Sequence, residues 1–420
     1  MGAAQTHLGD DFAPPGASRI PHTFRAFRHR NFRLFISGQI VSLVGTWMQN
    51  AAQSWLVYRL THSELLLGTA WFCSQIAVFA LGPLGGLVAD RFPRKQVVIL
   101  TQTASMLQAF VLALLTLTGV VQVWHVLALA AVLGTINAFD MPARQALVIE
   151  MTSKEDLINA ISLNSAVFNT ARVIGPAAAG LLVAALGEGL CFLLNGVSFL
   201  AVIVGLVAMR IPRSAPAEHP PLWQHLVDGF RYAAADSAVR RVLIVMGAAT
   251  LAGMPGLVLM PFFAGDIFHR GSAGYGALMS AMGVGAVAGA LGLARRTRTL
   301  GLAHIIAASG LCTGATYIAF GLSRSYWLSL ALMPFIGYSV MRQMAAANTT
   351  IQTLISEQYR GRIMALYAMT VVGLGPFGSL AAGAVAHQFG ARATMAAGGV
   401  LALAASTAFA ISLRRNPIAA

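Results

Sequence analysis

Long apolar stretches recur along this chain from Phe32 to Leu413, and each has about 18 residues or more. A helix of that length crosses roughly 30 Å of hydrocarbon. Only helices and closed barrels satisfy their backbone polar groups inside lipid, and the alternating strands of about ten residues that form barrels are absent from the sequence. The sequence therefore predicts an all-α integral membrane protein.

Composition excludes the main soluble classes. Charged residues make up 10% of the chain, against about 25% in soluble domains. The net charge of +14 does not indicate a nucleic-acid partner, because the Arg residues lie between apolar stretches and form no basic face. The three cysteines lie within apolar stretches without paired spacing, so we expect no disulfide framework, no metal and no cofactor.

Hydrophobic length and turn signals predict twelve transmembrane helices. They fall at about residues 33–59, 65–88, 97–118, 123–142, 160–186, 190–209, 242–264, 273–294, 301–321, 327–347, 363–386 and 392–413. One chain with twelve spans needs no partner to form a pathway, so we expect it to work as a monomer. The predicted location is the cell (inner or cytoplasmic) membrane, with multiple passes through the lipid bilayer.

Orientation follows from the 28 Lys and Arg residues, which accumulate in cytoplasmic loops of membrane proteins. With a cytoplasmic N-terminus, most of them lie on the cytoplasmic side. The exceptions are Arg59, Arg270, Arg324 and Arg392 on the opposite side, and Arg172 and Arg342 within spans. The bias predicts that both termini are cytoplasmic.

The chain is expected to divide into two pseudo-symmetric six-helix bundles. Ile174-Gly-Pro recurs as Leu374-Gly-Pro about two hundred residues later, the spacing that a duplicated half requires. The predicted linker is Pro-rich at its start and then amphipathic from Leu222 to Ala235. The predicted divisions are a cytoplasmic N-terminal segment 1–31, a bundle 32–209, a cytoplasmic linker 210–241, a bundle 242–413 and a cytoplasmic tail 414–420.

The loop between the second and third spans has a motif pattern typical of a gate. It carries Gly86, Asp90, Arg91, Arg94 and Lys95, with Pro93 in the middle. We expect Gly86 to let a helix approach closely, and Asp90 to offer a carboxylate to a helix N-terminus or to an Arg. Arg94 and Lys95 would pair with acids or anionic headgroups. Alternatively, this is an ordinary positive loop with one acid.

This loop resembles the signature of the major facilitator superfamily, apart from Pro93 where Gly is usual. The fifth span adds Gly175, Pro176 and Gly180, which resemble the Gly-Pro motif of the superfamily's antiporters; packing alone is the alternative. Segments such as Pro142-Ala-Arg144 and Phe168-Asn-Thr-Ala-Arg172 are similar to the branch with enterobactin-type siderophore exporters and macrolide efflux pumps. The resemblance implies the major facilitator fold and alternating access, and does not indicate the substrate.

Polar side chains on two spans are candidates for a substrate cavity. The first span carries Gln39, Thr46, Gln49 and Gln53 on one helix face with Trp47 and Asn50 beside it, and the fifth carries Asn169 and Arg172. The in-span Arg342 joins these candidates. Interhelical hydrogen bonding is the alternative. Amides suit an uncharged or zwitterionic amphiphile, whereas Arg172 would favour an anionic group, with Asn137 or Asp140 as its partner.

No Asp or Glu lies at the centre of a predicted span, which limits the sites for a coupling proton. Asp140 is the most embedded acid, and Arg144 follows it at i+4, so stabilisation of a helix end is the alternative role of this pair. The resemblance implies that Asp140 joins Asp90 in the gate, so Asp140, Asp90 and Arg144 are the coupling candidates.

The predicted function is a secondary exporter of a small amphiphilic molecule, siderophore-like or drug- and macrolide-like, by proton antiport. The alternative is an importer or uniporter of the same superfamily that is not coupled to protons. An enzyme is not expected, because the sequence shows neither a His/Asp/Glu cluster nor a phosphate-binding loop.

Overall fold

The computed structural model describes residues 22–153, 155–210, 230–296 and 301–418, and nearly all of them are helical. A short helix η1 (His22–Arg28) precedes the first long helix. The first group of helices comprises α1 (Arg30–Thr61), α2 (Glu64–Arg91), α3 (Arg94–Leu117), α4 (Val123–Glu150), α5 (Leu157–Leu186) and α6 (Glu188–Ala208). The second group comprises α8 (Ser237–Gly253), α9 (Pro255–Val258), α10 (Met260–Phe262), η2 (Phe263–Ile267), α11 (Gly271–Ala294), α12 (Leu302–Leu322), α13 (Tyr326–Leu354), α14 (Glu357–Ala368), η3 (Met369–Gly373), α15 (Gly375–Phe389) and α16 (Ala391–Arg415).

Ten helical segments of the described chain are long and apolar enough to cross a membrane. The long helices α1 and α13 are not among them, because polar residues such as Gln49 and Asn50 in α1 and Arg342 and Gln343 in α13 lower their hydropathy. Large apolar side chains such as Leu100 and Val204 are exposed on the outside, as lipid contact requires. The chain is therefore a multi-pass membrane protein, and the full set of twelve spans stays a prediction.

Two of the membrane segments are interrupted helices. The segment Ser237–Ile267 breaks around Pro255 and Pro261, since proline has no N–H to donate and crowds the preceding turn. The segment Glu357–Phe389 passes through the wider turn η3 immediately before Gly375 and Pro376. Both breaks lie in the second group, and the first of them lines a cavity described below.

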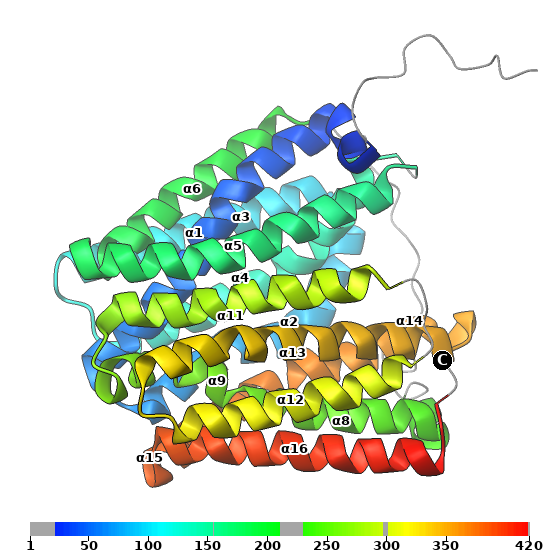
Figure 1. The fold of residues 1–420 in the computed structure, drawn as a ribbon. Coiled ribbons are helices and arrows are strands. Elements are labelled where there is room, and N and C mark those ends of the chain that lie inside the picture. The colour runs from blue at the N-terminus through cyan, green and yellow to red at the C-terminus, as the bar shows by residue number, and fades with distance from the viewer. Residues whose placement is uncertain (1–21, 154, 211–229, 297–300, 419–420) are drawn as a thin grey trace, which may run out of the picture.

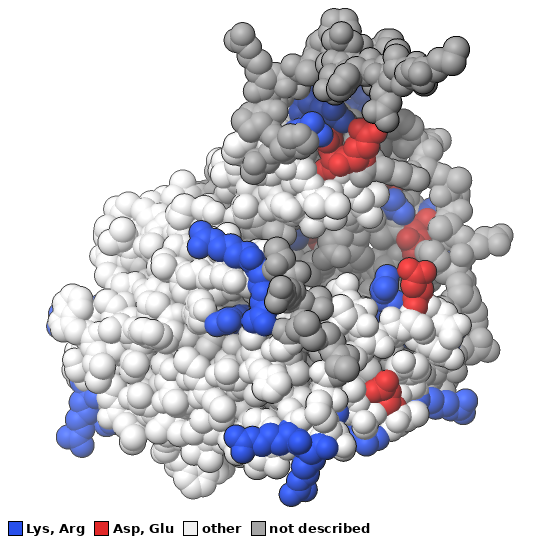
Figure 2. Space-filling model, turned by 45° about the vertical axis from the view of Figure 1, so that its right-hand side comes forward, with Lys and Arg blue, Asp and Glu red and all other residues white. Residues whose placement is uncertain are grey.

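The helices of each group pack mainly on one another, and the two groups meet through a few pairs. The main pairs are α5 with α11 and α2 with α15, and smaller contacts join α2 to α9 and η3 and join α1 to α10. We call the end of the molecule that carries Arg30 of α1 and Arg415 of α16 the basic end, and the other the far end. In Figure 1, α1, α5 and α6 slope away from α8 and α16 toward the basic end on the right. Figure 2 turns that end forward and shows most of the visible charged side chains around its rim, with broad uncharged surface elsewhere.

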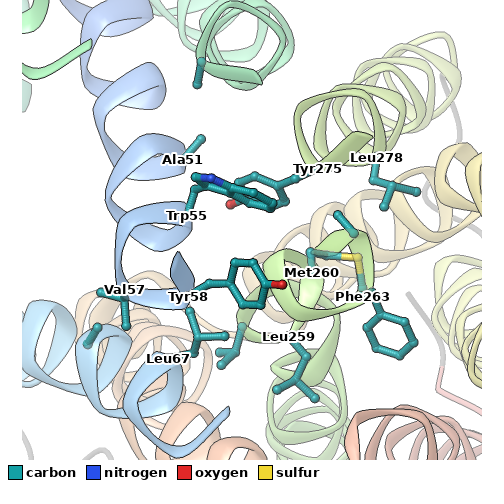
Figure 3. Packing of buried hydrophobic residues seen from close by; sticks show 14 of the residues in the cluster. Ala51, Trp55, Val57, Tyr58, Leu67, Leu259, Met260, Phe263, Tyr275 and Leu278 are labelled. Carbon is teal, nitrogen blue, oxygen red and sulfur yellow. The ribbon is translucent and has the colours of Figure 1, made fainter. Parts of the chain in front are cut away.

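Close contacts hold the two groups together toward the far end. Trp55 of α1 stacks on Tyr275 of α11, with ring centroids 6.1 Å apart and ring planes 21° apart, and Figure 3 shows the two rings next to each other. The hydroxyl of Tyr58, near the end of α1, donates to Asp266 of η2 over 2.8 Å. The far end is therefore closed by both apolar stacking and a hydrogen bond.

Two glycine crossings complete this closure. A Cβ built on Gly68 of α2 would lie 2.5 Å from the carbonyl oxygen of Ser379 and 3.0 Å from Cα of Gly383 in α15. A Cβ on Gly276 of α11 would lie 2.5 Å from the carbonyl oxygen of Pro176 in α5. Because these distances are shorter than any ordinary carbon contact, only glycine allows backbones from the two groups to approach so closely.

The predicted linker cannot be judged from the structure. Residues 211–229 lie outside the described part of the chain, and most of the amphipathic helix predicted from Leu222 to Ala235 falls there. The described residues 230–235 are helical and lead into α8, whose first turn is capped by Asp236. The division of the chain at 210–241 stays a prediction.

Candidate functional site

Arg172 of α5 lies between the two groups of helices and borders two cavities. Its guanidinium carbon lies 5.8 Å from the ring centroid of Trp47 in α1, a cation–π arrangement. Among the described residues it has no hydrogen-bond or ion-pair partner, and the partners predicted for it, Asn137 and Asp140, make no such contact with it. Its donors are therefore available to a ligand.

Three cavities adjoin one another across the molecule. The interface pocket, of about 200 Å³, lies between the groups and is lined by Trp47, Asn50, Ala51, Ser54, Trp71, Arg172, Pro176, Leu257, Tyr275, Met279 and Met282. The second-half pocket, of about 290 Å³, shares Arg172, Leu257 and Met282 with it. The first-half pocket, of about 100 Å³, shares Asn50, Ser54 and Trp71 with it. The three pockets thus form one series with Arg172 near its middle.

The two ends of this series differ in chemistry. The first-half pocket is polar, with Gln53, Ser74, Gln75 and Asn137 among its lining residues. The second-half pocket is largely apolar and contains four methionines, Met246, Met254, Met282 and Met344. Methionine side chains are flexible and adapt to irregular apolar shapes. A molecule that fits the whole series would have a polar part, an apolar part and, near Arg172, an anionic group.

The polar stripe of α1 divides between two environments. Trp47 and Asn50 line the interface pocket, and Gln53 lines the first-half pocket. Gln49 turns instead into the first group, where its amide donates to Gln108 over 3.0 Å and accepts from Asn195 over 2.8 Å. Gln49 thus makes the interhelical hydrogen bonds that were the alternative interpretation for this stripe.

The remaining polar candidates lie outside the lining of the three pockets. Gln39 is buried within the first group, with 2% of its surface exposed. The hydroxyl of Thr46 donates to the carbonyl of Ser42 in its own helix, and the Asn169 amide donates to the carbonyl of Ser165. The carbonyl oxygen of the Asn169 side chain is shielded and has no described partner.

Arg342 lies away from the series of pockets. It is on α13 and lines a separate groove with residues of α12, whereas its neighbour Gln343 faces the second-half pocket. The structure therefore does not bring Arg342 together with Arg172, and its surroundings are taken up below.

The gate motif lies at the basic end, where its cations contact acids and carbonyls of the same group. The Arg94 guanidinium donates to Glu150 at the end of α4 over 2.7 Å. Lys95 donates to the carbonyl of Met209, just past the end of α6, over 2.7 Å, which suits the negative end of a helix. Asp90 is half-buried in the last turn of α2, and Arg91 beside it is exposed. Through Arg94 and Lys95, the loop after α2 therefore contacts the ends of α4 and α6.

The close helix approach predicted at Gly86 occurs one residue earlier. No described atom outside its own helix neighbourhood lies within 4 Å of a Cβ built on Gly86, whereas a Cβ on Gly85 would lie 1.9 Å from the carbonyl oxygen of Ala138 in α4. The prediction for Gly86 was wrong because two adjacent glycines point about 100° apart around a helix, and sequence alone does not show which one faces the neighbour.

Asp140 is the centre of a buried polar cluster between α3 and α4. Its carboxylate accepts from the Thr101 hydroxyl over 2.7 Å and from the Gln102 amide over 2.9 Å, and lies 3.1 Å from the Arg144 guanidinium. Only 2% of its surface is exposed. Because it contacts a second helix, Asp140 does more than pair within one helix end.

The Gly-Pro motif of α5 lies between two other helices. A Cβ on Gly175 would lie 2.4 Å from Cβ of Trp47 in α1, and one on Gly180 would lie 2.8 Å from the carbonyl oxygen of Ser272 in α11. Pro176 itself lines the interface pocket. The motif therefore packs α5 tightly while it forms part of a cavity wall.

Several lining residues were not among the sequence candidates. Trp71 of α2, Tyr275 of α11 and Gln343 of α13 border the pockets, and the indole nitrogen of Trp71 and the amide nitrogen of Gln343 are shielded without a described partner. None of the three belongs to a polar stripe like that of α1, so no stripe marked it. The available signals were their polar neighbours, Ser74 and Gln75 near Trp71 and Arg342 beside Gln343.

Comparisons with known proteins agree with this architecture. The profile of a family described as transmembrane secretion effector matches residues 22–418. The chain is 23% identical over 402 residues to the staphyloferrin A transporter of Staphylococcus aureus (strain NCTC 8325 / PS 47), covering 90% of this chain and 95% of the relative. It is 24% identical over 348 residues to the enterobactin exporter EntS of Shigella boydii serotype 4 (strain Sb227), covering 82% and 83%.

A solved structure shows the same fold. A bacterial homologue of the human lysosomal transporter Spinster, in an inward-facing and occupied conformation, superimposes with a TM-score of 0.72 at 13% identity, over 93% of this chain and 97% of that one. The match to the family profile spans nearly the whole chain, which confirms the family predicted from the sequence motifs. The chain belongs to the major facilitator superfamily, within its transmembrane secretion effector family, and is a membrane transporter and not an enzyme.

Proposed function

We propose that this chain is a secondary exporter of a small amphiphilic molecule with an anionic group, such as a siderophore, in the cell membrane. The observation that carries the proposal is Arg172, which borders both the interface and the second-half pockets with its donors unused by described residues. The names of two relatives, a staphyloferrin A transporter and an enterobactin exporter, support the substrate class. Drug-like or macrolide-like amphiphiles are the other cargo that the apolar pocket would suit.

Substrate recognition would use the difference between the two ends of the pocket series. Amides and hydroxyls of the first-half pocket bind the polar part, and the methionines of the second-half pocket accept the apolar part. Arg172 pairs with a carboxylate or another anion, and the face of Trp47 holds its guanidinium in place.

Transport would follow alternating access between two bundles that correspond to the two groups of helices. The contacts of Tyr58 with Asp266 and of Trp55 with Tyr275 close the far end. With both termini cytoplasmic, as the distribution of Lys and Arg predicts, this state opens toward the cytoplasm. Export would then start from the state described here, with substrate reaching Arg172 from the basic end.

Proton coupling would depend on Asp140. It is buried, it connects α3 with α4, and Arg144 lies within ion-pair distance. Protonation would remove the charge that Arg144 and the α3 donors stabilise, and so would release contacts near the gate motif. Asp90 is the second candidate in this region. No acid lines the three pockets among the described residues, which favours coupling at a distance from the substrate.

Substrate binding tests the role of Arg172. Binding of siderophores, macrolides and lipophilic amines to purified protein is measured by quenching of tryptophan fluorescence, with Arg172→Gln compared against Arg270→Gln. Arg270 is a matched control, because its guanidinium also lies over aromatic rings, 5.4 Å from Tyr326, but outside the pockets. We expect at least about tenfold weaker binding of the anionic ligand in Arg172→Gln only, from the loss of a charge-assisted contact. Equal affinity in both variants would refute the assignment.

Coupling is tested separately with Asp140→Asn. The asparagine retains an acceptor for Thr101 and Gln102 but cannot carry a charge. We expect substrate binding to persist while movement driven by a pH gradient is lost. Asp236→Asn is the control, because the Asp236 carboxylate caps the first turn of α8 and, among the described residues, contacts no pocket or gate residue. If Asp140→Asn retains transport driven by the pH gradient, Asp140 is a structural residue. If transport by the unmodified chain is independent of the pH gradient, the uncoupled importer or uniporter is favoured.

A further inference from the structure

A second basic site lies in the second group of helices, away from the pockets just described. Helices α11 and α12 both pack on α13 but make little contact with each other. Beside the end of α11, a groove of about 590 Å³ runs along α12 and α13, and its lining includes Arg296, which follows α11, together with His304, Ser309, Tyr338 and Arg342. We call it the α11–α12 groove. It shares no lining residue with the second-half pocket, so it is a separate feature.

Arg342 gives the groove a charge with little internal compensation. Its Nη1 donates to the Tyr338 hydroxyl over 2.8 Å, and its guanidinium carbon lies 5.5 Å from the centroid of that ring. Its Nε is shielded and has no described partner. Tyrosine is a neutral partner, so the positive charge of Arg342 is held in place but is not neutralised.

The sequence shows that the surrounding helices supply no carboxylate. Between Asp266 and Glu357 there is not one Asp or Glu, and this interval contains the whole of α11, α12 and α13. Asp266 lies at the far end, where it accepts from Tyr58, and Glu357 is an exposed residue at the start of α14. A cation at membrane depth without a carboxylate is costly, so an anion from outside the chain would stabilise it.

The position of the groove along the membrane identifies where that anion would come from. The 21 residues of α12 span about 31 Å, close to the thickness of the hydrocarbon layer. His304 lies in its first turn and Ser309 about 7.5 Å further in, so the groove runs from the edge of the hydrocarbon, next to the headgroups, into its outer part. Arg296 and His304 are exposed at its mouth.

We propose that the α11–α12 groove binds the phosphate of an anionic phospholipid, with Arg342 as the inner ligand and Arg296 and His304 at the mouth. The Tyr338 hydroxyl orients the guanidinium, whose remaining donors point to a bidentate contact with phosphate oxygens. Free inorganic phosphate shares this chemistry, and the experiment below separates the two sources.

The test is native mass spectrometry of the purified full-length chain in neutral detergent, titrated with phosphatidylglycerol or phosphatidylcholine. Arg342→Gln is compared with Arg414→Gln, an exposed arginine at the same end of the molecule that does not line the groove. We expect preferential binding of phosphatidylglycerol, at least about tenfold weaker in Arg342→Gln and unchanged in Arg414→Gln. Equal loss in both variants, or no preference between the lipids, would overturn the proposal.

Two further arms cover the other outcomes. If Arg342→Gln does not fold, His304→Asn replaces it, and we expect a loss of several-fold, since one contact at the mouth is removed; unchanged binding would count against the site. Inorganic phosphate is added alone while thermal unfolding is followed. Stabilisation by phosphate that depends on Arg342, without binding of phosphatidylglycerol, would overturn the lipid as the source and assign the groove to free phosphate.

Discussion

The closure of the far end depends on backbone contacts that a single methyl group would break. In Gly68→Ala, the added Cβ would lie 2.5 Å from the carbonyl oxygen of Ser379, about 0.9 Å closer than ordinary contact allows. Both atoms belong to rigid helices, so the strain is relieved most easily when α2 and α15 separate. Overpacking of this kind costs about 1–3 kcal/mol, which corresponds to a shift of about 5- to 150-fold toward the state open at the far end.

Distances between spin labels measure this shift directly. Labels are attached to Val120 and Leu322, exposed far-end residues of the first and second groups, in a background without the three native cysteines. We expect Gly68→Ala to populate a longer distance. Gly82→Ala is the matched control, because it lies on the same helix and no described atom outside its own helix neighbourhood lies within 4 Å of its added Cβ. Equal distributions of label distances in the two variants would show that the contact of Gly68 with α15 does not hold the far end closed.

Three further predictions use the same measurements and thermal unfolding. Tyr58→Phe removes the hydrogen bond to Asp266, which is worth about 1 kcal/mol. We expect the population with the longer label distance to rise about fivefold; an unchanged distribution would show that this bond does not hold the far end closed. Gly285→Ala places a Cβ 1.9 Å from the carbonyl oxygen of Pro334, and this overlap should cost about 3 kcal/mol and lower the unfolding temperature. Gly292→Ala on the same helix adds a Cβ that meets only ordinary contacts, so its unfolding temperature should stay unchanged. Burial raises the pKa of Asp156, but the hydrogen bond with His29 and the charge of Arg28 outweigh it and hold that pKa below its usual value. Asp156→Asn should therefore lose stability at neutral pH, and the difference in stability from the unmodified chain should vanish as the pH falls through the lowered pKa of the folded state; a difference that persists in acid would contradict this.

The membrane segments could be predicted from sequence because their length and apolar content are set by the bilayer. What could not be predicted were the interruptions inside two of them. Pro255 and Pro261 both lie inside the predicted span 242–264, and proline within an apolar stretch can either end a helix or merely break its hydrogen bonds. The widened turn at Met369–Gly373 has no sequence signature of its own.

The sequence predicted some residues of the candidate site and missed others. Arg172 was identified because a charge is rare within a span, and Trp47 because it lies beside the polar stripe of the first span. Gln49 belongs to the same polar stripe as Gln53, yet it faces Gln108 and Asn195. A stripe shows which residues share a helix face, but which neighbour that face contacts is decided by packing between distant helices.

The most direct test of the account is proton movement coupled to export. The full-length chain is reconstituted in liposomes with an interior pH dye and an imposed pH gradient, and is challenged with siderophores, macrolides and lipophilic amines. We expect proton flux that requires one anionic amphiphilic substrate, that fails in Asp140→Asn and that weakens in Arg172→Gln. Movement of the same substrate with no proton flux in the unmodified chain would contradict it.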